Sequence, residues 1–456
     1  MLAGGLGFIA LTGAAASALA ASFSPIKVLF FMVALLAGAI AASGLQHGIT
    51  LLAGALAFPV ATQILFGVDL HAVHLLIGLV VVMGLIGMSL HARPAPAAFV
   101  TPCAVMIVSA TAAAFAGPEP GPSLFREANG LVLVLLVGIV IAATFEPERD
   151  LLPLVWAMVA GLAGTSVVAL GQKLGVTPAA LVPIQYAGGR INGMFGHPND
   201  LGGFIVAQIL LLTGIAASAW RRLPFAPLVI LPALALGLSA LIATQSRGAL
   251  LALIAGTAVV MVLLSARRQA MAVVGILLIL GLALLVIIPS VPSAERTQFT
   301  QRLQQLSQPN AEQGRRGVYR AAFAEIGKHP ITGVGVFEFQ RIINTDPPVP
   351  GLEFGLGHAH NIILEGWLSL GLLGLLAFAY LWGAGARRLW RATRTRPGED
   401  PLIAAWAIGA LGALASMFVQ GMTDVLFNAI EIFTLFILLL ATGFAFERRR
   451  NESARP

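Results

Sequence analysis

Three short polar segments interrupt long apolar runs in this sequence, and one further polar residue lies in a later turn. Their side chains are the ones best suited to chemistry. In chain order they are Arg190, His197 and Asn199; Ser246 and Arg247; His358, His360 and Asn361; and Asp424. A guanidinium group is planar, always charged, and binds two phosphate oxygens at once. An imidazole accepts a proton near neutral pH. Two arginines beside one imidazole would therefore suit a diphosphate leaving group with an acid–base partner.

Each of these segments also has a simpler interpretation. An arginine between apolar runs, such as Arg247, can extend its charged end to water from a helix terminus, as can Arg190. The pair His197 and Asn199 is better explained by a turn followed by a helix N-cap at Asn199 or Asp200. The histidines before Ile362 can be interfacial residues that end a loop. The segments together favour a site, because the predicted topology below brings them to one face.

The composition predicts a polytopic membrane protein. The 456 residues are 58% hydrophobic and only 10% charged, whereas soluble domains carry about 25% charged residues. Apolar runs of about 20 residues favour helices over a barrel. The net charge of +7 lies mostly in short arginine clusters between these runs, so it determines topology and gives no reason to expect nucleic-acid binding. The lone Cys103 excludes an intramolecular disulfide and a thiolate metal site.

The predicted fold is all-α, with about 12 to 14 transmembrane helices. The lower number allows for the first three runs, which are rich in glycine and alanine. The runs lie at 2–22, 27–45, 49–67, 72–92, 97–117, 129–145, 151–172, 200–219, 224–243, 247–265, 270–289, 361–386, 401–422 and 425–446.

Arginine clusters predict the orientation, because cytoplasmic loops are enriched in basic residues. Four clusters agree if the spans alternate: Arg221-Arg222, Arg267-Arg268, Arg387 to Arg396 and Arg448 to Arg450. Lys27 is the exception. The connections that carry the polar segments then face the periplasm of a Gram-negative inner membrane.

The chain divides into four predicted parts. Residues 1–172 hold N-terminal spans, 173–289 a transmembrane core with the arginine segments, 290–360 one long periplasmic loop, and 361–456 the C-terminal spans. Within the loop, mixed charges predict one helix over 295–306. Asn310 could cap a second helix that runs from Ala311 and ends near Gly327 and Pro330. A loop of this length and pattern is usually functional.

Several common catalytic motifs are missing. The sequence has no Asp-x-Asp pair of the metal–nucleotide type, no Walker A loop, no HExxH zinc site and no GxSxG elbow. A transferase built this way would take its donor from the lipid phase. The alternative class is a glycolipid transporter, which usually places charges near mid-bilayer on several helices. The first seven predicted spans are almost devoid of such charges.

Three elements together resemble the O-antigen ligase and polymerase family. His360-Asn361, nine residues and Gly371-Leu-Leu-Gly374 are similar to its His-Asn-(nine)-Gly-x-x-Gly signature. The Ser-Arg-Gly around Arg247 and the Arg190-to-Asn199 segment resemble two further elements, in the same order. The resemblance spans about Arg190 to Phe378.

This resemblance implies a GT-C-like, inverting, metal-independent glycosyltransferase with no cofactor. Its donor would be a glycan on undecaprenyl diphosphate, and its acceptor a glycan or glycolipid at the periplasmic face. Arg190 and Arg247 would bind the diphosphate, and His360 would orient or deprotonate the acceptor hydroxyl. Ligation of O-antigen onto lipid A-core is the favoured activity, with O-antigen or exopolysaccharide polymerisation as the alternative. Six more residues are expected to contact substrate: Asn361, His358, His197, Asn199, Ser246 and Asp424.

Overall fold

The structure is a computed structural model, and it describes most of the chain. The described residues are 43–59, 61–63, 69–90, 93–182, 186, 189–223, 225–264, 309–345, 358–394, 396 and 398–454. Within them, eight helices are long and apolar enough to cross a membrane, and two shorter apolar helices lie at Leu228–Thr244 and Arg247–Leu263. The all-α prediction for a multi-pass membrane protein is confirmed, apart from one short antiparallel strand pair.

The helices and strands follow one another in this order. They are α3 (Leu45–Ala55), β1 (Ala61–Gln63), β2 (Asp69–His71), α4 (Ala72–Leu90), α5 (Ala97–Ala116), α6 (Pro120–Arg126), the π-helix η1 (Glu127–Val132), α7 (Leu133–Thr144), α8 (Pro147–Lys173), η2 (Ala179–Leu181), α9 (Pro198–Ala219), η4 (Trp220–Arg222), α10 (Ala226–Thr244), α11 (Arg247–Leu263), α14 (Pro309–Lys328), α15 (Glu338–Thr345), α16 (Ile362–Ala392), α17 (Pro401–Gly421), η7 (Leu426–Asn428) and α18 (Ile430–Ser453).

Most predicted spans coincide with these helices. The run at 49–67 is different, because α3 ends at Ala55 and turns follow it. Pro59 accounts for this ending, since the residue before a proline disfavours helical backbone. At 1.5 Å per residue, the 11 residues of α3 are too short to cross a bilayer. The runs at 2–22 and 270–289, and nearly all of 27–45, lie outside the described residues.

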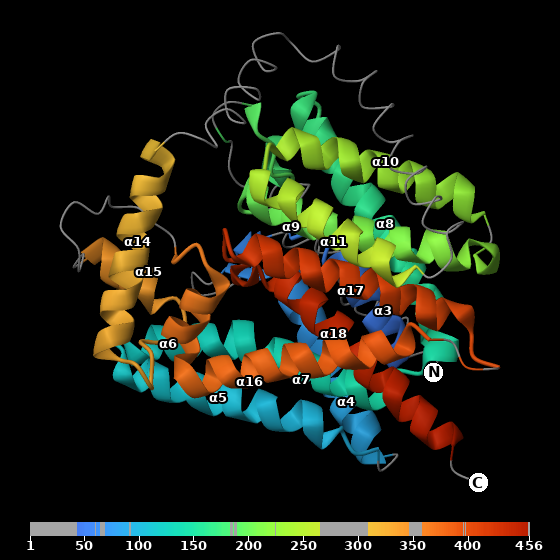
Figure 1. The fold of residues 1–456 in the computed structure, drawn as a ribbon, viewed down its shortest axis with the longest axis horizontal. Helices are drawn as coiled ribbons and strands as arrows, with labels where there is room; N and C mark the ends of the chain where they lie inside the picture. The colour runs from blue at the N-terminus through green and yellow to red at the C-terminus, as the bar shows by residue number, and fades with distance from the viewer. Residues whose placement is uncertain are drawn as a thin grey trace, which may run out of the picture.

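Helix α17 packs closely against both α9 and α11 (Figure 1). A Cβ atom at Gly214 of α9 would meet the backbone of Gly409, and one at Gly256 of α11 would meet the carbonyl oxygen of Gly412. Small residues at such contacts let helix backbones approach each other, as is common in membrane proteins. Helices α9 and α11 begin at polar segments, and α17 ends three residues before Asp424. Because α17 runs in the opposite direction to α9 and α11, their packing brings these polar ends together.

A second group of helices lies on the other side of α17 and α18 (Figure 1). In this group α16 packs along α5. Helix α18 connects to the group through its contacts with α7 and α16. Near the start of α16, the helix α14 crosses the end of the bundle. The helix predicted from Ala311 is confirmed as α14, although it begins at Pro309. The sequence did not predict α15, and the helix expected at 295–306 lies outside the described residues.

Helix α16 is broken at Gly371, whose φ of 66° and ψ of 179° are not helical. The segment Ile331–Val334 supplies partners for the freed backbone groups. The Leu372 N–H donates to the Ile331 carbonyl (3.0 Å), and the Val334 N–H donates to the Leu368 carbonyl (2.7 Å). At this break, the segment Ile331–Val334 is therefore hydrogen-bonded to α16.

Candidate active site

The start of α16 positions the two histidines. Asn361 is the N-cap, and its side-chain oxygen accepts from the N–H groups of Ile363 (2.9 Å) and Leu364 (3.2 Å). This satisfies two of the four N–H groups that a helix start leaves without partners. Just before the cap, His360 has a φ of 49°. Left-handed backbone is unusual for a residue other than glycine, and it concentrates at functional sites.

His358 and His360 both face Asp424, which lies between α17 and α18. His358 Nε2 is 3.2 Å and His360 Nδ1 is 3.3 Å from the same Asp424 oxygen, Oδ1. The two rings contact each other with centroids 4.2 Å apart. His360 is the more accessible histidine, with 29% of its side chain exposed against 19% for His358 and 9% for Asp424.

The hydrogen bonds assign the protons on both rings. The backbone N–H of His360 donates to His358 Nδ1 (3.2 Å), so this nitrogen carries no proton and Nε2 donates to Asp424. The carboxylate of Asp424 accepts from His360 Nδ1. Neutral His360 therefore keeps a lone pair on Nε2. This is the arrangement in which a carboxylate orients an imidazole to act as a base.

Burial and neighbouring charges both shift the pKa values in this cluster, and the pKa values of His358 and Asp424 both end below their ordinary values. Burial lowers the pKa of His358 to about 4; the charge of Asp424 opposes this shift, and His360 adds to it. Burial alone would raise the pKa of Asp424. Hydrogen bonds from His360 and Asn199 and the charge of His358 outweigh it, so this pKa lies well below its ordinary value. At neutral pH, His358 is neutral and Asp424 is ionised.

Asn199 links this cluster to Arg190. The Asn199 amide nitrogen donates to Asp424 Oδ2 (2.6 Å), and its oxygen accepts from Arg190 Nη2 (2.9 Å). A further bond from Arg190 Nε to the Thr244 carbonyl (3.0 Å) ties the guanidinium to the end of α10. A continuous chain of hydrogen bonds thus runs from Arg190 through Asn199 and Asp424 to His360.

Arg247 is the first residue of α11 and lies at the same end of the bundle. Ser246 caps this helix, and its oxygen accepts from the Ala249 N–H (3.4 Å). Ser246 is only 2% exposed, so its structural role as a cap is clear. A Cβ atom at Gly248 would contact the hydroxyl of Thr423, the residue before Asp424. The backbone around Arg247 therefore adjoins the Asp424 turn.

The expected N-cap at Asn199 or Asp200 is wrong. Helix α9 already begins at Pro198, and the Asn199 N–H donates to Nδ1 of His197 (3.1 Å), which takes the capping role. Proline is well suited to the first turn of a helix because it has no N–H to leave unpaired. This earlier start leaves the Asn199 side chain available to bridge Arg190 and Asp424.

One group of described residues could hold a metal ion. His358, His360 and Asp424 each offer a ligand atom, and these atoms lie within 4.8 Å of one another. Imidazole nitrogen and carboxylate oxygen are both zinc ligands. In the observed arrangement, however, direct N–H···O contacts already satisfy the nitrogens that face Asp424.

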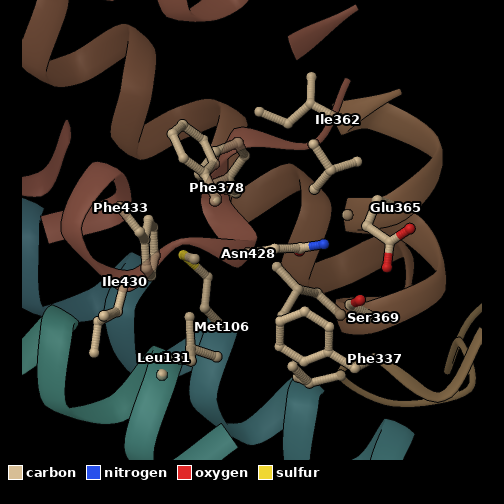
Figure 2. A pocket seen from close by; sticks show the side chains of 16 residues that line it. Met106, Leu131, Phe337, Ile362, Glu365, Ser369, Phe378, Asn428, Ile430 and Phe433 are labelled. Atoms are coloured by element: carbon tan, nitrogen blue, oxygen red, sulfur yellow. The ribbon is translucent and has the colours of Figure 1, made fainter. Parts of the chain in front are cut away.

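An apolar cavity of about 130 Å³ adjoins the cluster. Figure 2 shows Phe337, Phe378 and Phe433 around it, with Glu365 and Ser369 on one side. Ile362 and Val425, which also border the cavity, follow the histidine segment and Asp424 in the chain. The candidate site therefore has a polar side with arginines and an apolar side with aromatic residues.

The sequence reasoning missed three residues that support the site. Glu365 Oε2 accepts from the Ala359 N–H between the two histidines (2.9 Å), the Tyr319 hydroxyl contacts the His360 carbonyl (3.5 Å), and Gln420 donates to the Asn199 carbonyl (2.8 Å). A signal for Glu365 was present, because an ionisable residue inside an apolar run is by default a functional candidate. Tyr319 and Gln420 carried no such signal.

Residues 232–379 match the family described as O-antigen ligase. This range contains Arg247, both histidines and the Gly371 break, whereas Arg190, Asn199 and Asp424 lie outside it. A comparison with curated proteins found no match. The family match indicates an activity of the O-antigen ligase or polymerase type.

Proposed function

We propose that this chain, whose residues 232–379 match the O-antigen ligase family, transfers a glycan from undecaprenyl diphosphate to an acceptor hydroxyl at the periplasmic face of the inner membrane. The favoured reaction is ligation of O-antigen onto lipid A-core. One observation carries the proposal: Asp424 contacts His360 on one side and, through Asn199, Arg190 on the other. An acid–base group and a phosphate-binding group thus share one hydrogen-bonded unit.

The proposed reaction uses these contacts in the following way. His360 Nε2 removes the proton from the acceptor hydroxyl while the oxygen attacks the anomeric carbon of the donor. The bond from that carbon to the diphosphate breaks, and the anomeric configuration inverts because attack comes from the opposite face. Arg190 and Arg247 stabilise the negative charge that develops on the diphosphate. Since two guanidinium groups neutralise this charge, the proposal requires no metal, and EDTA should leave the rate unchanged.

A matched pair of histidine variants tests the chemistry. In proteoliposomes supplied with lipid-linked glycan and acceptor, His360→Gln should lower the transfer rate by about 100- to 10,000-fold, the usual contribution of a positioned base. His329→Gln, a histidine at the end of α14 outside the cluster, should keep the wild-type rate. Wild-type transfer by folded His360→Gln would remove His360 from the mechanism.

A polymerase would use the same three residues, because both reactions displace the same diphosphate. A strain that lacks this protein distinguishes the two activities. For a ligase, long glycans should accumulate on undecaprenyl diphosphate while the lipid A-core stays bare. Products that carry a single repeat unit would instead identify a polymerase. An unchanged glycan profile in every pool would contradict both.

A further inference from the structure

A second cavity, which is polar, lies at the end of α16 farthest from His360. Helix α16 has 31 residues and is therefore about 45 Å long, so its last turns lie at the opposite end of the bundle. There a cavity of about 400 Å³ is bordered by five arginines: Arg388, Arg391, Arg394, Arg396 and Arg450.

Carboxylates balance only part of this positive charge. Glu447 pairs with Arg388 (2.6 Å) and Arg391 (3.0 Å). Glu399 pairs with Arg450 (2.6 Å). Within the described part of the chain, neither Arg394 nor Arg396 forms a salt bridge. The cavity therefore keeps an excess of guanidinium groups.

Arg450 fixes the shape of the cavity. Its guanidinium donates to the carbonyl oxygens of Arg391 and Arg394, both at 2.9 Å, as well as to Glu399. These bonds tie α18 to the end of α16 and to the turn that follows. Arg450 is only 12% exposed, and Arg388 lies 3.9 Å above the ring of Phe444. A cavity held by such contacts is preorganised, which lowers the cost of binding a ligand.

We propose that this cavity binds the phosphate group of an anionic phospholipid. Guanidinium groups bind phosphate oxygens bidentately, and basic pockets between transmembrane helices are suited to anionic head groups. Trp390 borders the cavity and is 47% exposed, and Arg394 lies 4.9 Å above its ring. An exposed tryptophan at a helix end is typical of the level of the lipid head groups. A lipid is therefore favoured over a free anion. This site is separate from the proposed reaction and does not depend on it.

Native mass spectrometry of the purified full-length protein tests the proposal. The protein is equilibrated with equal amounts of phosphatidylglycerol and phosphatidylcholine, and the retained lipids are counted. Wild type should retain phosphatidylglycerol preferentially. The double variant Arg394→Gln/Arg396→Gln should retain at least about tenfold less phosphatidylglycerol than wild type, because each arginine contributes to binding an anionic lipid. Both side chains are exposed, so folding should be unaffected; if the double variant does not fold, Arg396→Gln alone should show a smaller loss.

The control variant removes two positive charges from the same end of the bundle but outside the cavity. Arg221→Gln/Arg222→Gln, in η4 just after α9, should retain phosphatidylglycerol like wild type. Equal losses in both double variants would reduce the effect to general surface charge and overturn the site. No preference in wild type would also overturn it. Displacement of the lipid by millimolar inorganic phosphate would show a free-anion site instead.

Discussion

At the residue scale, Asp424 determines what His360 can do. Its carboxylate accepts from His360 Nδ1 and so leaves Nε2 as the basic nitrogen. In the Asp424→Asn variant, the new amide could instead donate to Nδ1, which would move the proton to Nε2 and block the base. We therefore expect this variant to lower kcat by about 100- to 10,000-fold, with a much smaller effect on KM.

The control for this variant lies at the other end of the same helix. Asp400 caps α17 by accepting from the Leu402 N–H (2.9 Å). Because asparagine caps helices as well as aspartate does, Asp400→Asn should behave like wild type. If Asp424→Asn kept a kcat as high as that of Asp400→Asn, Asp424 would not be orienting the base.

The neutral state of His358 predicts how stability depends on pH. Its pKa is about 4 in the folded protein, below the ordinary 6.5. The unfolded chain therefore binds the proton more readily between these values. Proton binding by the unfolded chain therefore lowers the free energy of unfolding as the pH falls below 6.5. By pH 4 the protein has lost about 3 kcal/mol of stability from this histidine. The lowered pKa of Asp424 adds a further loss below about pH 4.

Thermal unfolding in detergent from pH 7 to 4.5 measures this effect. The wild-type unfolding temperature should fall as the pH decreases, and His358→Gln should show a flatter profile because glutamine does not titrate. The lowered pKa of His197 contributes the same trend to both proteins, so it cancels in the comparison. Parallel profiles would contradict a neutral, buried His358.

At the scale of elements, the break in α16 explains the first glycine of the Gly371-Leu-Leu-Gly374 signature. A φ near 66° with an extended ψ is accessible almost only to glycine. A Cβ atom there would also collide with the carbonyl oxygen of Ile331. The glycine therefore lets Ile331–Val334 dock onto α16, a few turns past the His358–Asp424 cluster.

Substitution of this glycine should be costly. Gly371→Ala should destabilise the protein by at least about 1–3 kcal/mol, the usual cost of a strained backbone residue. Gly383→Ala is the matched control, because it lies in the same helix with open space around it and alanine favours a helix over glycine. Thermal unfolding of the two purified variants provides the measurement. A Gly371→Ala protein as stable as Gly383→Ala would show that the break is not required.

Much of the element order could be predicted, because long apolar runs and arginine clusters are strong signals. The apolar runs at 361–386, 224–243 and 247–265 placed the start of α16 and the break between α10 and α11 to within a residue or two. Other features depend on tertiary contacts that a sequence does not display. The kink at Gly371 needs the docked Ile331 segment, and the bridge by Asn199 needs α17 to bring Asp424 beside α9. The topology and the family resemblance both led us to expect Arg190 and His360 on one face, but the hydrogen-bonded route between them through Asn199 and Asp424 was not foreseen.

At the scale of the whole molecule, the two ends of the bundle differ: one holds the candidate site, and the other holds arginine-rich helix termini. The candidate site lies where α9, α11 and α16 begin and α17 ends. At the opposite end, arginine-rich helix termini are joined by ion pairs, such as Arg449 with Glu148 (2.9 Å) and Arg93 with Glu146 (2.7 Å). Because basic residues concentrate on the cytoplasmic side, this polarity predicts that the His358–Asp424 cluster faces the periplasm.

Accessibility of introduced cysteines tests that orientation. In a Cys103→Ala background, Arg320→Cys on the exposed side of α14 and Arg222→Cys in η4 lie at opposite ends of the bundle. A membrane-impermeant thiol reagent should label Arg320→Cys in intact spheroplasts and Arg222→Cys only after lysis. The reverse pattern would place His360 in the cytoplasm, away from a periplasmic acceptor. Labelling of both before lysis would show leaky membranes and call for a repeat with sealed vesicles, in which the two cysteines must again differ if the bundle spans the bilayer with this polarity.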